Sequence, residues 1–148
     1  MGLMDRFCGA CVMGVAAFVS LGAHAQTLAA CEQSVDYKIA SLDPGAPPAA
    51  AVLQGVWLGS WEGGLCSALI VESVSKDGEV QAWYVFGRYS PWQISQPGKQ
   101  RWAGKLSDRK LVFKGARGSA DYTLVAPTQL AGIYYSNNGQ YKGAFTKK

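Results

Sequence analysis

The side chains that most often perform catalysis or bind metals are scarce in this chain of 148 residues. It has one histidine, His24, and four cysteines, Cys8, Cys11, Cys31 and Cys66. A serine or cysteine nucleophile usually needs a histidine as its base, and zinc sites use histidine and cysteine ligands. Which of these side chains are available depends on how the N-terminus is processed.

The first residues have the organisation of a secretory signal peptide. Met1–Arg6 carries a positive charge, Phe7–Leu21 is apolar and uncharged, and Ala23-His24-Ala25 is a small-x-small cleavage site. The apolar run is too short for a membrane span with a stop-transfer flank, so we expect removal of residues 1–25 rather than an uncut N-terminal anchor. This predicts a periplasmic or secreted protein with no membrane span after cleavage.

An alternative processing site lies slightly downstream. Leu28-Ala29-Ala30-Cys31 resembles a bacterial lipobox, in which Cys31 would become a lipidated N-terminus. An apolar run should adjoin such a box, but polar residues separate the two here. Cleavage at the first site removes Cys8 and Cys11 and leaves Cys31 and Cys66, and an even pair in an exported protein indicates a disulfide. We therefore predict a Cys31–Cys66 bond and keep the lipoprotein as the alternative.

The same cleavage removes His24, which leaves the mature chain without histidine and with two oxidised thiols. This excludes Ser-His-Asp and Cys-His catalysis and histidine-containing zinc sites. A carboxylate pair such as Glu62 with Glu72 or Asp121 could hydrolyse a glycoside, but the spacing does not define their separation. We expect no catalytic residue, no metal site and no cofactor. The removed segment carries one acid and one base, so the net charge stays at +4, too low to indicate nucleic acid binding.

The rest of the chain alternates short apolar runs with turn residues, the pattern of an all-β domain. For example, Trp102, Gly104 and Leu106 share one face of a run, and Asn137-Asn138-Gly139 is a hairpin turn. Short turns make successive strands antiparallel, and so many strands in sequence curl and close. We predict a single antiparallel up-and-down barrel within residues 52–148. It has about eight strands, at residues 52–62, 65–75, 79–87, 100–107, 109–115, 119–125, 129–136 and 140–147.

The first three predicted strands are apolar on both faces, so their outer face must be covered. Ala30–Leu42 has apolar residues at helical spacing, ends at Asp43-Pro44-Gly45 and precedes a Pro/Ala linker at residues 46–51. We predict that residues 26–51 form a short N-terminal helix and this linker. The helix would pack outside the barrel, held to the second strand by the Cys31–Cys66 bond.

Gly55-Val56-Trp57 at the start of the barrel, the Asp77-Gly78 turn and the closing run Gln140–Lys147 resemble the calycin group, which comprises lipocalins and avidin-type barrels. The start also resembles small secreted barrels of Gram-negative bacteria that begin Gly-x-Trp-x-Gly-x-Trp and have no assigned activity. The resemblance implies that the tryptophan of the first strand plugs one end of the barrel. It carries over no biotin or retinoid site, because no ligand-contacting set of residues matches.

Large aromatic residues are numerous for so small a barrel. Eight-stranded barrels have interiors just wide enough to be filled by side chains. We therefore predict that most of these residues, together with Leu111, belong to the core rather than to a ligand site. The set is Trp57, Trp61, Trp83, Trp102, Leu111, Phe113, Tyr122 and Phe145.

The one long connection, residues 87–100, is the strongest candidate for a binding site. It combines two prolines with aromatic and cationic residues, and exposed side chains of these types are typical of recognition surfaces. We expect Trp92 to be exposed with Arg88 or Lys99 within reach, although the loop could instead only cap the barrel end. The pattern predicts a non-enzymatic protein that binds a small ligand or an envelope component through the barrel mouth. The predicted contacts are Arg88, Tyr89, Trp92, Lys99 and Arg101.

A second function stays open, because basic residues cluster around the fourth and fifth predicted strands. Such a face would suit an acidic partner protein or an anionic envelope glycan, as in a periplasmic enzyme inhibitor or a chaperone-like barrel. Alternating lysines can also simply keep an exposed strand soluble. The basic set is Arg88, Lys99, Arg101, Lys105, Arg109, Lys110 and Lys114.

Overall fold

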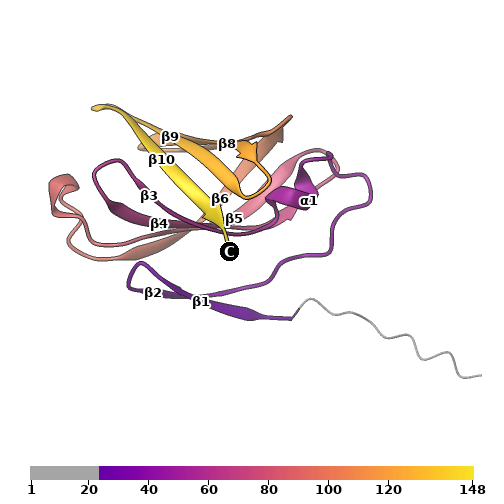
Figure 1. Ribbon diagram of the computed structural model, residues 1–148, viewed down its shortest axis with the longest axis horizontal. Helices are drawn as coiled ribbons and strands as arrows, with labels where there is room; N and C mark the ends of the chain where they lie inside the picture. Colours follow the sequence, from indigo (N-terminus) through magenta and orange to yellow (C-terminus); the bar gives the residue numbers. More distant parts are fainter. Residues whose placement is uncertain (1–23) are drawn as a thin grey trace, which may run out of the picture.

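A computed structural model of the protein describes residues 24–148 (Figure 1). The predicted signal peptide, residues 1–25, therefore lies outside the described residues except for His24 and Ala25. The elements in chain order are β1 (Gln26–Ala30), β2 (Gln33–Tyr37), α1 (Ala50–Leu53), β3 (Gly55–Trp61), β4 (Leu65–Val74), β5 (Glu79–Phe86), the short 3-10 helix η1 (Ser90–Trp92), β6 (Gly98–Ser107), β7 (Lys110–Gly115), β8 (Gly118–Ala126), β9 (Gln129–Ser136) and β10 (Gly139–Lys147).

The barrel predicted from the alternating pattern is confirmed. Strands β3 to β10 form a closed barrel in which each strand pairs antiparallel with the next. The closing pair is β10 with β3, where Gly143 lies opposite Trp61 and Lys147 lies opposite Trp57. No helix within residues 24–148 has the length and apolar character needed to cross a bilayer.

The predicted N-terminal helix is wrong: the segment forms a β-hairpin instead. β1 and β2 pair antiparallel as a separate two-stranded sheet. The turn consists of Cys31 and Glu32, both with positive φ of 51° and 62°, as a two-residue hairpin turn requires. Cys31, Val35 and Ile39 are four residues apart, a spacing that keeps residues on one side of a strand as well as of a helix. The spacing therefore could not distinguish the two structures.

The prediction that the N-terminal segment covers the outside of the barrel is confirmed. Figure 1 shows the β1–β2 hairpin lying against the barrel beneath β3 and β4. Leu28 and Val35 of the hairpin are buried in one cluster with Ala68, Ile70 and Val85, which point outward from β4 and β5. This second apolar layer explains why these strands are apolar on both faces.

The predicted disulfide is also confirmed. Cys31, in the hairpin turn, is bonded to Cys66 on the outer face of β4, across 35 residues of sequence. In the chain-entropy model, closing a loop of that length stabilises the fold by about 3–4 kcal/mol. The disulfide therefore attaches the hairpin to the barrel at the N-terminal end of β4.

One end of the barrel is closed by α1. Ala50 and Leu53 of this helix are fully buried, and the Leu53 carbonyl accepts a 2.9 Å hydrogen bond from Nε1 of Trp57 inside the barrel. The ammonium group of Lys147 lies 5.3 Å from the centre of the Trp57 ring and donates to the Val52 carbonyl. Trp57 thus plugs this end, as the resemblance implied.

Glycines make room for the second tryptophan inside the barrel. Trp61 is 1% exposed and lies against Gly132 of β9 and Gly143 of β10. A Cβ atom at Gly143 would be 2.7 Å from the Trp61 ring, and one at Gly132 would be 2.9 Å from it. Contacts this short do not occur between real Cβ atoms and their neighbours, so both positions require glycine.

The predicted core residues are mostly, but not all, inside the barrel. The predicted residues that are buried inside it are Trp57, Trp61, Leu111, Phe113, Tyr122 and Phe145. Two tryptophans differ from the prediction. Trp83 is half-buried on the outer face beside the hairpin cluster, and Trp102 is half-buried at the open end.

Candidate binding site at the barrel mouth

The loop between β5 and β6 is at the end of the barrel opposite α1 (Figure 1). It is held by its own hydrogen bonds: the backbone groups of Tyr89 and Ile94 bond to each other in both directions, at 2.9 and 3.1 Å. η1 has a proline, Pro91, in its first turn and ends at Gln93, whose φ is 58°. The loop therefore has a regular, internally hydrogen-bonded structure at this end of the barrel.

Trp92 connects this loop to the far side of the opening. Its ring lies 5.7 Å from that of Tyr89, edge to face, and 4.3 Å from that of Tyr141 on β10. Trp92 is half-buried rather than exposed as predicted, because these two rings cover part of it. The loop thus partly caps the barrel end and also contributes a wall to the opening.

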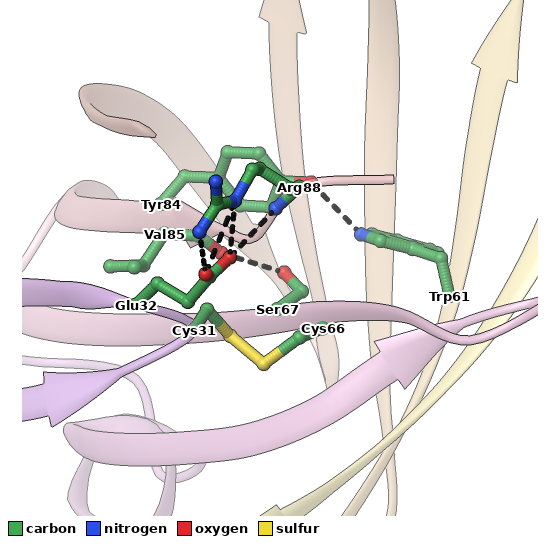
Figure 2. Close-up of a disulfide and its surroundings, with 8 residues drawn as sticks. All are labelled: Cys31, Glu32, Trp61, Cys66, Ser67, Tyr84, Val85 and Arg88. Carbon is green, nitrogen blue, oxygen red and sulfur yellow. Dashed lines mark hydrogen bonds and ion pairs between the residues drawn. A yellow bond between two sulfur atoms is a disulfide. The ribbon is translucent and has the colours of Figure 1, made fainter. Parts of the chain in front are cut away.

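The predicted cations do not gather around Trp92. Arg88 binds Glu32 in the hairpin turn, with Nε 3.2 Å from both carboxylate oxygens (Figure 2). Lys99 donates a 2.8 Å hydrogen bond to the carbonyl of Ser34 on β2. Both side chains therefore attach the barrel to the hairpin on its outer surface.

Arg101 has a similar role further along β6. It forms an ion pair with Glu72, and its guanidinium lies 4.7 Å from the centre of the Trp83 ring. Glu72 also accepts a 3.1 Å hydrogen bond from the backbone N–H of Lys38, just after β2. The structure thus separates the predicted site into two groups. Tyr89 and Trp92 lie at the mouth, and Arg88 and Lys99 make contacts at the hairpin side. Arg101 belongs to both groups, since it also borders the opening at the mouth.

The Glu32–Arg88 pair has the expected electrostatic signature. The hydrogen bonds from Arg88 lower the pKa of the Glu32 carboxyl below its usual 4.5, and the bond to Glu32 raises the pKa of the Arg88 guanidinium. Both side chains are exposed, at 47% and 58%, so solvent screens the attraction between them.

A cavity of about 700 Å³ opens at the mouth, under the β5–β6 loop. Its walls come from strands β4 to β9, from the β7–β8 turn and from the loop. Trp102 stacks on Tyr84 with ring centres 4.0 Å apart and planes within 10° of parallel. The aromatic residues that line the cavity are Tyr84, Phe86, Trp92, Trp102, Phe113 and Tyr134.

The cavity has an aromatic floor, because the barrel is filled below it. The Tyr84 hydroxyl accepts a 3.0 Å hydrogen bond from Nε1 of Trp61 (Figure 2). Trp61 packs on Tyr122 and Phe145, with ring centres 5.7 and 5.3 Å away. Burial raises the pKa of both Tyr84 and Tyr122, and the buried hydroxyl of Tyr122 has no hydrogen-bond partner among residues 24–148. The barrel is therefore filled from α1 up to Trp61 and open above it.

Three cations border the cavity: Arg101, which is paired with Glu72, and two at the rim that have no such partner among residues 24–148. Lys114 near the end of β7 and Arg117 in the β7–β8 turn both line it and are exposed. No aspartate or glutamate is among the lining residues. From the sequence, Lys114 belonged to the basic set, but Arg117 lay between the predicted strands at residues 109–115 and 119–125.

Trp102, Tyr134 and Arg117 were not predicted as site residues. A usable signal was the order of the turns, because in an up-and-down barrel every second turn lies at the same end. The β7–β8 turn must then share an end with the β5–β6 loop, as it does in Figure 1. Trp102 was predicted to be core because the alternating pattern shows that it faces inward. The pattern does not show whether an inward residue is covered.

The three carboxylates considered for catalysis do not form a pair. Glu72 binds Arg101, Glu62 accepts a 3.2 Å hydrogen bond from the backbone of Lys142, and Asp121 lies 3.9 Å from Lys110. None of them lines the mouth cavity. Within residues 24–148, no group of three or more histidine, cysteine, aspartate or glutamate side chains is arranged to hold a metal ion.

The fold and the site define a small closed antiparallel β-barrel with an aromatic cavity at one mouth. The chain matches no protein-family model and no curated protein.

Proposed function

We propose that this protein is an exported, non-enzymatic binding protein that takes a small ligand into the barrel mouth under the β5–β6 loop. The observation that carries the proposal is the cavity of about 700 Å³ with aromatic walls. Ligand sites are typically apolar cavities of about 300–1,000 Å³ with a few polar groups at defined positions. Trp92 and Trp102 expose part of their rings here, where an apolar ligand would remove them from water.

The export part of the proposal is supported by the N-terminal pattern and by the disulfide. Structural disulfides persist in oxidising compartments such as the periplasm or the outside of the cell. The bond uses the Cys31 thiol, which lipidation at the alternative site would also need. This favours a periplasmic or secreted protein over a lipoprotein.

The mouth is favoured over the basic face as the binding surface because carboxylates neutralise much of that face. Arg101 pairs with Glu72, Lys105 lies 2.7 Å from Glu79, and Lys110 lies near Asp121. An acidic partner protein or an envelope glycan would have to compete with these carboxylates. A ligand at the mouth meets no such competition.

The test uses Nile red, a neutral fluorescent dye, as a probe of the mouth. We expect Trp92→Ala to weaken binding of the dye by about 1–2 kcal/mol, the loss typical of an interface anchor. Trp83→Ala is a matched control, because Trp83 is also half-buried but lies on the outer face, and it should leave binding unchanged.

Thermal unfolding of both variants separates binding from stability. If Trp92 were only a cap, Trp92→Ala would lower the unfolding midpoint strongly and leave the affinity for the dye unchanged. Equal weakening by Trp92→Ala and Trp83→Ala would also contradict the proposal, since the dye would then bind outside the mouth.

A further inference from the structure

We infer that the ligand of the mouth is an anion: a compact ring compound with a carboxylate or phosphate group that lies between Lys114 and Arg117. The inference rests on the proposed function, since it names the class of ligand for the same cavity. It follows from the charges at the rim, from the depth of the cavity and from the shape of its walls.

Within residues 24–148 the two rim cations have no carboxylate partner, in contrast to four other cations of the barrel. Lys99, Arg109 and Lys147 also lack one, but each donates to a backbone carbonyl. Arg88, Arg101, Lys105 and Lys110 each form an ion pair. Within residues 24–148, neither Lys114 nor Arg117 has an acidic side chain within 4.0 Å or a side-chain hydrogen bond, although Lys114 is only four residues from the paired Lys110. With no acid among the lining residues, the cavity presents positive charge at its rim. This charge is available to a ligand.

The two cations suit an anionic group that is bound at the edge of an apolar surface. A guanidinium such as that of Arg117 can donate two parallel hydrogen bonds to a carboxylate or phosphate, and an ammonium such as that of Lys114 adds a point charge. Aromatic walls next to the cations lower the local dielectric, which strengthens the attraction relative to bulk water. The headgroup would stay at the rim while the rest of the ligand enters the cavity.

The floor limits the shape of that remaining part. Trp61 and Tyr122 are at most 1% exposed and fill the barrel below Tyr84, so a long alkyl chain has no channel to enter. The walls are rings, among them the stacked Tyr84 and Trp102 and the adjacent Phe113, 5.4 Å from Trp102. Flat faces of this kind pack best against a flat ligand. The geometry therefore favours one or two fused rings over an acyl chain.

The experiment compares two dyes on one pair of variants. Anilinonaphthalene sulfonate is a fused-ring anion, and Nile red is a neutral ring compound of similar kind. We expect the double variant Lys114→Gln with Arg117→Gln to weaken binding of the anionic dye about tenfold or more, as loss of charge-assisted hydrogen bonds does. Binding of Nile red should change less than about twofold, which is below 0.5 kcal/mol. Added salt should weaken binding of the anionic dye to the native protein more than to the double variant.

The matched control removes the same charge elsewhere. Lys38→Gln with Lys76→Gln also lowers the net charge by two, and both of these lysines are exposed and absent from the residues that line the cavity. This control should leave the affinity for both dyes unchanged. If this control weakens binding of the anionic dye as much as the rim variant does, the effect comes from net charge and the inference is overturned.

Competition identifies the headgroup and the body of the ligand. Naphthoate and naphthyl phosphate should both displace the anionic dye, and the stronger of the two identifies the preferred headgroup. Laurate, which carries a carboxylate on an alkyl chain, should displace it poorly. Displacement by laurate at least as strong as that by naphthoate would overturn the inferred ring.

The inference and the proposed function fail in different ways. If neither dye binds the native protein, or if Trp92→Ala affects neither, the proposed mouth site itself is wrong. If Nile red binds at the mouth but the rim variant affects both dyes equally or not at all, the mouth site stands and the anionic ligand is wrong.

Discussion

The two ends of the barrel are stabilised by different means. At the α1 end, Leu53 and Trp57 are fully buried, and this packing closes the barrel from within. At the mouth the interior is open, and the stabilising bonds lie on the outer surface of the barrel. There the Cys31–Cys66 disulfide and the Glu32–Arg88 ion pair attach the β1–β2 hairpin. In Figure 2 the disulfide and the ion pair lie close together beside the start of the loop.

The comparison shows how a cavity can exist in a small barrel. An end that is filled gains hydrophobic stabilisation for every side chain it buries. An end that keeps a cavity gives up part of that stabilisation, and here the attachments of the hairpin to the rim compensate for it. Tryptophan therefore has a different role at each end. Trp57 is covered by α1 and belongs to the core, while Trp102 is half-buried and lines the cavity.

The largest effect is expected at the closed end. Trp57→Ala should lower the free energy of unfolding by about 3–5 kcal/mol, as large-to-small changes in packed cores do. Urea unfolding measures the loss. Binding of Nile red at the mouth should persist below the unfolding transition. A variant with an unchanged midpoint and lost dye binding would show that Trp57 belongs to the site and that the two ends are not separate.

The next largest effect is expected from removing the disulfide at the mouth end. Cys31→Ser with Cys66→Ser should lower the free energy of unfolding by about 3–4 kcal/mol, because the unfolded chain regains the freedom of a 35-residue loop. Hydrogen exchange should become faster in β1, β2 and residues 87–97, while β3 next to α1 stays protected. If hydrogen exchange became equally fast at both ends of the barrel, the disulfide would not act mainly on the mouth end.

Removing the buried hydroxyl of Tyr122 should stabilise the protein rather than destabilise it. Because it is fully buried without a partner, Tyr122→Phe should raise the free energy of unfolding at neutral pH by about 1 kcal/mol. Matched against it, Tyr84→Phe removes the acceptor for Trp61 and should lower stability. A loss of stability in Tyr122→Phe would mean that a bound water or ligand satisfies this hydroxyl.

Both tyrosines also predict the response to alkaline pH. Burial raises the pKa of Tyr84 and Tyr122 above the usual 10.0, so the unfolded state releases these protons first. The stability they contribute is complete below pH 10.0 and is lost as the pH rises through their native pKa. Unfolding measured from neutral to alkaline pH should show a shallower decline in Tyr122→Phe, and an unchanged slope would contradict the raised pKa.

The smallest effect is expected from the ion pair at the mouth. Arg88 lowers the pKa of Glu32, so the pair stabilises the native state above pH 4.5, and this contribution is lost as the pH falls through the lower native pKa. Exposed pairs of this kind contribute little. We expect Glu32→Gln to leave the unfolding midpoint unchanged and to accelerate hydrogen exchange only near residue 88. A large drop in the midpoint would make the pair as important as the disulfide.

Much of the fold could be predicted from local pattern. The alternation in the strands predicted the barrel, and the even number of cysteines that the expected cleavage would leave predicted the disulfide. The failure at residues 30–42 has a physical reason: a spacing of four residues suits both a helix and a strand, and the turn depends on positive φ at Cys31 and Glu32, which neither residue type signals. The site could be predicted only in part. Tyr89 and Trp92 reach the mouth, but Arg88 and Lys99 bind the hairpin, and Arg101, which borders the cavity, is paired with Glu72.

The sequence by itself determined which residues share a face of each strand, since the direction of a side chain follows from its position in the alternation. Where both faces are apolar it did not determine which one is inward, as Trp83 on the outer face shows. It also determined that the strands are antiparallel, because short turns allow nothing else. Only the tertiary structure decided which inward residues are covered and which cations find a carboxylate. Trp61 and Trp102 both face inward, yet β9 and β10 bring glycines against the first and leave the second at an opening. Coverage and charge pairing depend on distances between segments far apart in the chain, and closure of the barrel sets those distances.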